Sequence, residues 1–153
     1  MATRSSIAYK TTRGVTAVYC HWDGYPEYVG RVLHENYQAA YKIGKLVAHG
    51  DVSSLGPEIG KQHSFDTRDG EDTWTTFYTR DRGEDCPSKE FETIQEWMEH
   101  YDWSDYYYLW NGKEWLVHTR WPTSLSRPNN TDENGYPIFD RVEDVLAQPA
   151  EAC

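Results

Sequence analysis

The chain has 153 residues, with 25 Asp and Glu side chains against 15 Lys and Arg, so its formal net charge is −10. A protein that binds duplex nucleic acid by neutralising phosphates needs a surplus of basic side chains, so this composition excludes that class. The length matches one domain with a core of its own. No run of about 18 apolar residues is present and the first residues lack a signal-peptide pattern, so we expect a soluble intracellular protein without a membrane span.

The cysteines and aromatic residues set two further expectations. Cys20, Cys86 and Cys153 are odd in number and widely spaced, which favours reduced thiols over a zinc site or a disulfide framework. Seven Trp and twelve Tyr residues supply rigid contact area for a core and for a binding surface. The acidity is uneven, because residues 1–60 carry five acidic and six basic side chains, whereas residues 61–153 carry twenty and nine.

The first half of the chain contains signals for two strands and two helices. β-rich segments at 7–9 and 15–22 flank a polar link that ends in Gly14, which predicts a hairpin. Pro26 suits a first helical position, and the apolar residues after it recur at helical spacing up to Tyr37. A shorter apolar stripe over 43–47, ended by Gly50, predicts a second helix.

The second half predicts a strand, a helix and a second hairpin. Residues 73–80 are rich in residue types that pack on a sheet, which predicts a strand. Pro87-Ser88 predicts the start of a helix whose apolar face runs from Phe91 to Tyr101. Asn111-Gly112 favours a two-residue turn between strands at 106–110 and 113–119. That turn sets three expected cross-strand pairs: Trp110 with Lys113, Tyr108 with Trp115, and Tyr106 with Val117.

The order ββααβαββ predicts an α+β fold, in which an antiparallel sheet of five to six strands has its helices packed on one face. Residues 1–120 form one domain in this interpretation. Residues 121–153 are rich in turn-forming types and are interpreted as an extended or partly ordered C-terminal arm, with a helical turn at 141–148.

The segment Cys20-His21-Trp22-Asp23 places several reactive side chains at the end of one strand. Cys20 and His21 point to opposite faces of a strand, which disfavours a Cys/His nucleophilic pair. His21 and Asp23 share a face and would begin a metal site, but a closed zinc site needs about four ligands and no cluster supplies the rest. The local structural alternative is that His21 and Asp23 hydrogen-bond to the following turn and to the start of the first helix, while Trp22 packs inward. We therefore assign no catalytic residue, no metal and no cofactor.

Arg80 and Arg82 stand in the most acidic part of the chain. The planar fork of arginine suits phosphate and carboxylate groups and stacks on aromatic rings. Intramolecular pairing with Asp81, Glu84 or Asp85 is the simpler interpretation. The remaining histidines are scattered, and no phosphate loop, dinucleotide fingerprint, HExxH or nucleophile elbow is present.

Four short segments of the sequence resemble those of a family of small proteins encoded by tailed bacteriophages. They are residues 2–5 (ATRS), 18–26 (VYCHWDGYP), 50–56 (GDVSSLG) and 77–84 (FYTRDRGE). The resemblance covers roughly residues 1–120, and the segment after Trp121 departs from it. It implies a phage accessory protein in the cytoplasm of a host bacterium, where interference with host defence is a common task. It supplies no activity, cofactor or catalytic residue.

Three functional hypotheses follow. In the first, a non-enzymatic protein sequesters a small nucleotide-like immune signal, with aromatic residues stacking on a base and arginines holding phosphate. Its expected ligand-binding residues are Arg4, His21, Trp22, Asp23, Tyr25, Arg80 and Arg82.

In the second hypothesis, an acidic inhibitor mimics nucleic-acid phosphates toward a basic host nuclease or a restriction or CRISPR factor, based on thirteen acidic against four basic residues over 66–105. The third is a nucleotide hydrolase centred on His21 and Asp23. Neither duplex nucleic acid nor a membrane is an expected partner, and the sequence leaves homo-oligomer formation open.

Overall fold

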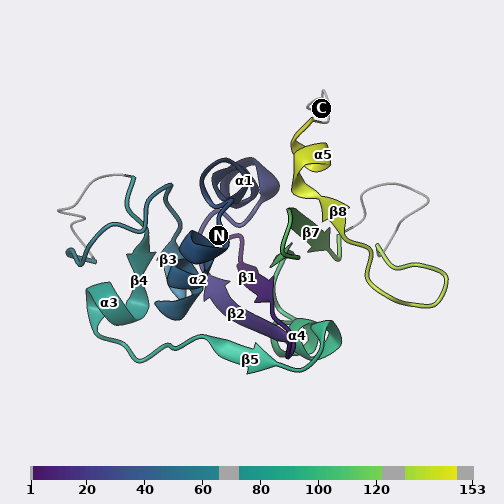
Figure 1. The fold of residues 1–153 in the computed structure, drawn as a ribbon, viewed down its shortest axis with the longest axis horizontal. Coiled ribbons are helices and arrows are strands. Elements are labelled where there is room, and N and C mark those ends of the chain that lie inside the picture. The colour runs from purple at the N-terminus through teal and green to yellow at the C-terminus, as the bar shows by residue number, and fades with distance from the viewer. Residues whose placement is uncertain (1, 66–72, 122–129, 148–153) are drawn as a thin grey trace.

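The computed structural model of the protein describes residues 2–65, 73–121 and 130–147 (Figure 1). The strands are β1 (Ser5–Lys10), β2 (Val15–Cys20), β3 (Val52–Ser54), β4 (Thr76–Phe77), β5 (Lys89–Phe91), β6 (Tyr106–Trp110), β7 (Trp115–Thr119) and β8 (Asp140–Arg141). The helices are a π-helical turn, η1 (Pro26–Gly30), then α1 (Arg31–Asn36), α2 (Ala40–Ala48), α3 (Tyr78–Arg82), α4 (Ile94–His100) and α5 (Val142–Ala147).

All eight strands belong to one mixed sheet, with the order β4-β3-β2-β1-β6-β7-β8 and with β5 paired to β2. The mixed α and β content is as predicted, but the antiparallel-only sheet of five to six strands is wrong. β1 pairs with β6 in parallel, and β2 pairs with β3 in parallel. For β2 and β3 the reason is the connection between them, because a crossover through η1, α1 and α2 returns the chain in the same direction.

The sheet is covered on both faces, so the expectation of helices on one face is also wrong. Successive strand residues alternate between the faces, and Ile7 and Ala8 belong to different buried clusters. The first cluster holds side chains from η1, α1, α2 and α5, and the second is centred on Trp97 of α4. In Figure 1, α1 and α5 lie above the central strands and α4 lies below them.

The second hairpin forms where it was predicted, but its register differs. Trp110 pairs with Trp115 and Tyr108 with Val117, so the loop has four residues instead of two. The Asn111 side chain causes the longer loop, because its Oδ1 accepts the backbone N–H groups of Lys113 and Glu114, both at 2.9 Å. The register moves by two residues, which leaves every side chain on the face that the alternation predicted.

Residues 73–80 form a strand only at Thr76–Phe77, and a short helix follows at once. The Asp81 carboxylate accepts the backbone N–H of Phe77 at 2.8 Å, which turns the chain into α3. Gly83, at φ 80°, ends that helix in the left-handed region that favours glycine.

The predicted helix start at Pro87 is wrong as well, because residues 89–91 form β5 and the helix begins at Ile94. The Thr93 hydroxyl accepts the Glu96 N–H at 3.1 Å, while the Glu96 carboxylate accepts the Glu92 N–H at 3.2 Å. This arrangement resembles a capping box and defines the start of α4.

The described part of the predicted C-terminal arm, residues 130–147, extends the sheet and the core. β8 pairs with β7, and Val142 of α5 is fully buried. The helical turn expected at 141–148 corresponds to α5, while 122–129 and 148–153 lie outside the described residues. Among the described helices, none has the length and apolar character needed to cross a membrane.

Candidate functional site

The candidate site lies at an irregular edge of the sheet. β5 pairs with β2 only up to Ala17, and β3 pairs with β2 only at Cys20. Tyr19 falls in the gap between these partners, and its backbone N–H donates to Asp51 Oδ1 at 3.0 Å. A carboxylate therefore takes the place of a strand carbonyl here, which holds Asp51 at this edge of the sheet.

A cavity of about 380 Å³ opens beside this edge, and we call it the aromatic recess. Its lining comes from the end of β2, the start of β5, the end of α4 and the segments before β1, β3 and β6. The lining residues are Arg4, Tyr19, Asp51, Lys89, His100, Tyr101 and Trp103.

Aromatic rings form one wall of the recess. The centroid of the Trp103 ring lies 4.9 Å from that of Tyr19 and 5.7 Å from that of Tyr101, both edge to face. The Arg4 guanidinium carbon lies 5.7 Å from the Trp103 ring centroid, within the range of a cation–π contact. Trp103 is 39% exposed, so this wall offers a flat surface to a ligand.

Positive charge gathers around the same wall. Arg4, Lys89 and His100 line the recess, and none of them forms an ion pair with a described residue. Burial raises the pKa of Asp51, although the Tyr19 N–H and the charges of Lys89 and His100 act against this shift. Burial also raises the pKa of Tyr19 to about 12, so its hydroxyl stays protonated at neutral pH.

Two of the predicted ligand residues, His21 and Trp22, adjoin the recess through Tyr19. The Tyr19 hydroxyl shares a hydrogen bond with His21 Nδ1, and the His21 ring lies edge to face with Trp22 at 4.6 Å. Burial and the charge of Arg4 lower the pKa of His21, so its imidazole is neutral at pH 7. Trp22 is 43% exposed and extends the aromatic surface beyond the rim.

Asp23 and Tyr25 do not line the recess and instead build the turn after β2. Asp23 has φ 55°, a left-handed conformation that directs the chain into η1. Its carboxylate accepts the Tyr25 hydroxyl at 3.2 Å, and its carbonyl accepts the Val29 N–H at 3.3 Å. Asp23 thus bonds within the following turn, as the local alternative expected. The rest of that alternative is wrong, because His21 bonds back to Tyr19 of β2 and Trp22 is exposed instead of packed inward.

The structure does not bring Arg80 and Arg82 to the recess. Arg80 donates to the carbonyl oxygens of Ile59 (2.9 Å), Gly60 (3.2 Å) and Thr75 (2.9 Å). It also donates to both carboxylate oxygens of Asp81, at 3.0 and 3.2 Å. Its donors are thus engaged within the fold.

Arg82 lies over the Phe65 ring and pairs with Glu84 at 2.8 Å, as the intramolecular alternative predicted. Burial acts to raise the pKa of Asp81, but hydrogen bonds from Arg80 and from the backbone N–H groups of Phe77 and His63 outweigh it and hold that pKa below its usual value.

A histidine near Arg80 resembles part of a catalytic arrangement. His63 Nε2 lies 3.1 Å from Thr76 Oγ1, and His63 Nδ1 lies 3.6 Å from Asp81 Oδ1. Thr76 is only 2% exposed and Asp81 is engaged by Arg80, so the hydroxyl is not presented to a substrate. Within the described ranges, no group of three or more His, Cys, Asp or Glu residues is arranged to hold a metal ion.

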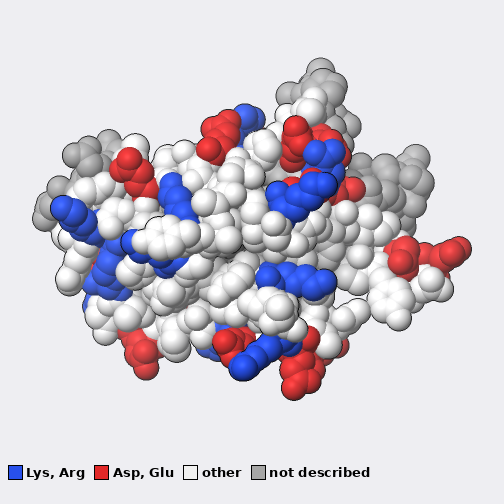
Figure 2. All heavy atoms as spheres, in the orientation of Figure 1, with Lys and Arg blue, Asp and Glu red and all other residues white. Residues whose placement is uncertain are grey.

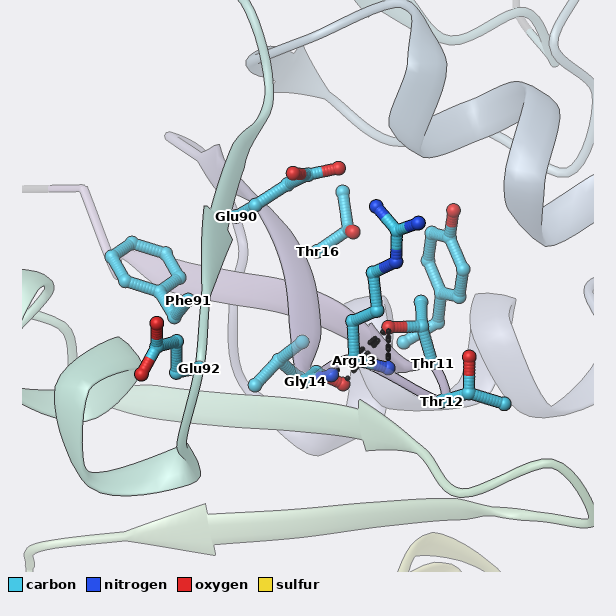
Figure 3. Close-up of a pocket in the computed structure, with 10 residues that line it drawn as sticks. Thr11, Thr12, Arg13, Gly14, Thr16, Glu90, Phe91 and Glu92 are labelled. Atoms are coloured by element: carbon cyan, nitrogen blue, oxygen red, sulfur yellow. Dashed lines mark hydrogen bonds between the residues drawn. The ribbon is translucent and has the colours of Figure 1, made fainter.

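A second cavity of about 530 Å³ lies at the turn of the first hairpin (Figure 3). Thr11 Oγ1 accepts the N–H groups of Arg13 and Gly14 and closes the turn. Figure 3 shows Arg13, from the hairpin turn, and Glu90, from β5, extending toward the same opening. With Glu92 also in its lining, this cavity has one cation against two carboxylates, so it is a poorer site for an anion than the aromatic recess.

Comparison of the chain with protein-family models, curated proteins and solved structures finds no match. Arg4 is the one predicted ligand residue that lines the recess, and sequence reasoning missed its other lining residues. Asp51, Lys89 and Trp103 lie far apart along the chain and share no motif, so no local signal connects them.

Proposed function

We propose that the protein is a non-enzymatic binding protein that sequesters a small nucleotide-like anion in the aromatic recess. The observation that carries the proposal is a local excess of cations in a chain of net charge −10. Arg4 and Lys89 line a cavity with an exposed indole, where Asp51 is the one carboxylate of the lining, and neither cation forms an ion pair with a described acidic side chain.

The side chains of the recess suit both the base and the phosphate of a nucleotide. An indole or phenol face stacks on any base, and such stacking contributes about 1–3 kcal/mol per base. A guanidinium offers paired N–H donors to phosphate oxygens, and charge-assisted hydrogen bonds are the stronger ones. The negative field of the whole chain opposes an anionic ligand, so the local clustering of cations is essential to the proposal.

The resemblance to phage proteins supports an immune signal of the host bacterium as the ligand, and sequestration as the mode of action. The neutral imidazole of His21 is hydrogen-bonded to Tyr19, and the Cys20 thiol is fully buried. Neither group is available as a nucleophile in this arrangement. The proposal therefore includes no turnover, and the hydrolase hypothesis ranks last.

The test combines calorimetry with product analysis. We expect at least one of a panel of mononucleotides, cyclic dinucleotides and ADP-ribose derivatives to bind, and chromatography after incubation to show the ligand unchanged. Trp103→Leu should weaken binding about tenfold or more through lost stacking. Tyr41→Leu is the control, because Tyr41 is 76% exposed on α2 and does not line the recess. Absence of binding across the panel would overturn the proposal, and product formation would favour the hydrolase.

A second candidate is the acidic inhibitor, because one stretch of the structure carries seven exposed carboxylates: Glu84, Asp85, Glu90, Glu92, Glu96, Glu99 and Asp102. Against it, the face in Figure 2 shows acidic and basic side chains interspersed, with no continuous acidic patch. This candidate predicts that the protein inhibits a purified basic nuclease, that inhibition falls as salt rises, and that Glu90→Gln with Glu99→Gln weakens it. Sequestration of a nucleotide in the aromatic recess predicts none of these effects.

A further inference from the structure

A second exposed indole lies at the same end of the sheet as the aromatic recess. Trp121 follows β7 directly and is 53% exposed. Tyr106, the first residue of β6, pairs with Thr119, the last residue of β7, so the segments before β6 and after β7 meet at one end of the strands. β1 runs parallel to β6 and starts at this end too, which brings Arg4 of the recess to the same place.

One carboxylate joins Trp121 to the recess. Asp105 Oδ2 accepts the backbone N–H of Arg4, and Asp105 Oδ1 accepts the indole N–H of Trp121, each at 3.1 Å. The Arg4 guanidinium in turn lies over the ring of Trp103. Trp103 and Trp121 therefore lie on either side of Arg4 and Asp105 in this chain of contacts. Their two rings make no stacked or edge-to-face contact with each other, so each offers its own surface.

The Trp121 ring is held in a defined position although it is exposed. Its backbone N–H donates to Thr119 Oγ1 at 3.2 Å, and its carbonyl oxygen accepts the side-chain amide of Asn130 at 2.7 Å. Asn130 is only 1% exposed and also donates to the Thr119 carbonyl oxygen at 2.7 Å. A ligand that stacks on a ring fixed in this way does not have to order it first, and that lowers the cost of binding.

The surroundings of Trp121 repeat those of Trp103. The Arg120 guanidinium carbon lies 5.9 Å from the Trp121 ring centroid, as the Arg4 guanidinium carbon lies 5.7 Å from that of Trp103. Like Arg4, Arg120 forms no ion pair with a described residue. Trp22, the third exposed indole near the recess, has no described cation over its ring. The combination of an indole and a guanidinium therefore occurs twice at this end of the sheet.

We propose that the ligand consists of two linked nucleotide units, with one base on Trp103 in the recess and the second base on Trp121. The inference deepens the proposed function and rests on it. Ligand sites run from about 300 to 1,000 Å³, so a cavity of about 380 Å³ is small, and a second unit would lie outside it. Trp121 is the surface on which that unit stacks.

The experiment compares ligands of equal charge on the full chain by calorimetry. The two-unit probes are the dinucleoside monophosphates of adenosine, guanosine, cytidine and uridine, each with two identical bases joined by one phosphodiester. The one-unit probes are the methyl esters of the matching 5′-monophosphates, which also carry one phosphodiester charge. A stacked base contributes about fivefold or more in affinity. We expect the two-unit ligand to bind tighter by that factor for the best base.

Three variants assign the gain to one ring. Trp121→Leu should remove the advantage of the two-unit ligand and leave the affinity of the one-unit ligand unchanged. Trp121→Phe lacks the indole N–H but keeps an aromatic face, so it should retain most of the advantage. Tyr41→Leu on α2 is the control and should change neither affinity, because Tyr41 is exposed away from the recess lining. Thermal unfolding of each variant establishes that it is folded.

The outcomes separate this inference from the proposed function. If both ligands bind equally tightly, or if Trp121→Leu leaves their ratio unchanged, the second stacking surface is wrong and the proposed function stands. If Trp121→Leu weakens both ligands alike, or if Trp121→Phe loses the advantage as fully as Trp121→Leu, stacking of a second base on Trp121 is wrong. A further gain of the same size with a trinucleotide would indicate a longer strand and would overturn the limit of two units. Silence across these probes and the wider panel overturns the proposed function itself.

Discussion

Arg80 and Arg82 stand two residues apart on α3, and the structure predicts opposite consequences for removing them. The Arg80 side chain is 12% exposed, while that of Asp81 is fully buried; Arg80 also donates to three backbone carbonyl oxygens. The Arg82 side chain is 52% exposed and pairs with a glutamate that is 46% exposed. The two variants Arg80→Ala and Arg82→Ala are therefore a matched pair within one helix.

The magnitudes follow from burial. Breaking a buried ion pair by removing one partner costs about 3–5 kcal/mol, because the remaining charge stays desolvated. We expect about 3 kcal/mol for Arg80→Ala, at the lower end, since the backbone N–H groups of Phe77 and His63 still bond to Asp81. Removing an exposed pair costs at most about 1 kcal/mol, which is the expectation for Arg82→Ala. A domain is stable by about 5–15 kcal/mol, so the first loss is large.

The assay is urea unfolding followed by tryptophan fluorescence, with the free energy of unfolding extrapolated to water for both variants. A cost for Arg80→Ala as small as that for Arg82→Ala would refute the structural role derived from its hydrogen bonds. Nucleotide binding adds a second readout, because folded Arg80→Ala should retain the affinity of the wild type. Selective loss of affinity at unchanged stability would restore Arg80 as a ligand residue.

Three further predictions concern the recess, the thiol and acid stability. Arg4→Gln should lose a charge-assisted hydrogen bond of about 1.5–3 kcal/mol, a tenfold or greater fall in nucleotide affinity by calorimetry, whereas Arg31→Gln should match the wild type. Burial raises the pKa of the Cys20 thiol to about 12, so peptide mapping should find it unmodified by iodoacetamide at pH 8 until urea is added; modification of the native protein would contradict its burial. The pKa of Asp81 is lower in the folded than in the unfolded state, so its stabilisation is complete above the unfolded value of about 3.9 and is lost as pH falls through the lower folded value. Urea midpoints between pH 6 and 3 should therefore fall less steeply in Asp81→Asn, and an unchanged slope would contradict this assignment.

Agreement between sequence and structure is closest where short-range signals act alone. The stripe of Ile43, Leu46 and Val47 predicts α2, and all three side chains are fully buried. The second hairpin lies where Asn111-Gly112 indicates, because turn chemistry is local. Its register is wrong by two residues because a side-chain oxygen, rather than the backbone conformation of Gly112, determines the loop length.

The errors occur where distant segments compete for the backbone. Residues 89–91 carry helical signals, yet they pair with β2 as β5 because that strand has a free edge at Val15–Ala17. The strand expected over 73–80 shortens because Asp81 accepts the Phe77 N–H and starts a helix. In both places hydrogen bonds to a partner that the local pattern does not indicate decide the conformation of the backbone.

The sequence by itself determined the mixed α and β content, the first hairpin, α2, the place of the second hairpin, the aromatic richness and the acidity, because these follow from composition and from local patterns along a single segment. Only the tertiary structure decided the parallel pairings, the two-sided cover of the sheet and the grouping of Arg4 with Lys89, Asp51 and Trp103. Such groupings depend on strand order, which no local pattern encodes. The tertiary structure also gives Arg80 and Arg82 different surroundings. Arg80 donates to carbonyl oxygens of other segments, whereas the Arg82 side chain stays 52% exposed and pairs with Glu84.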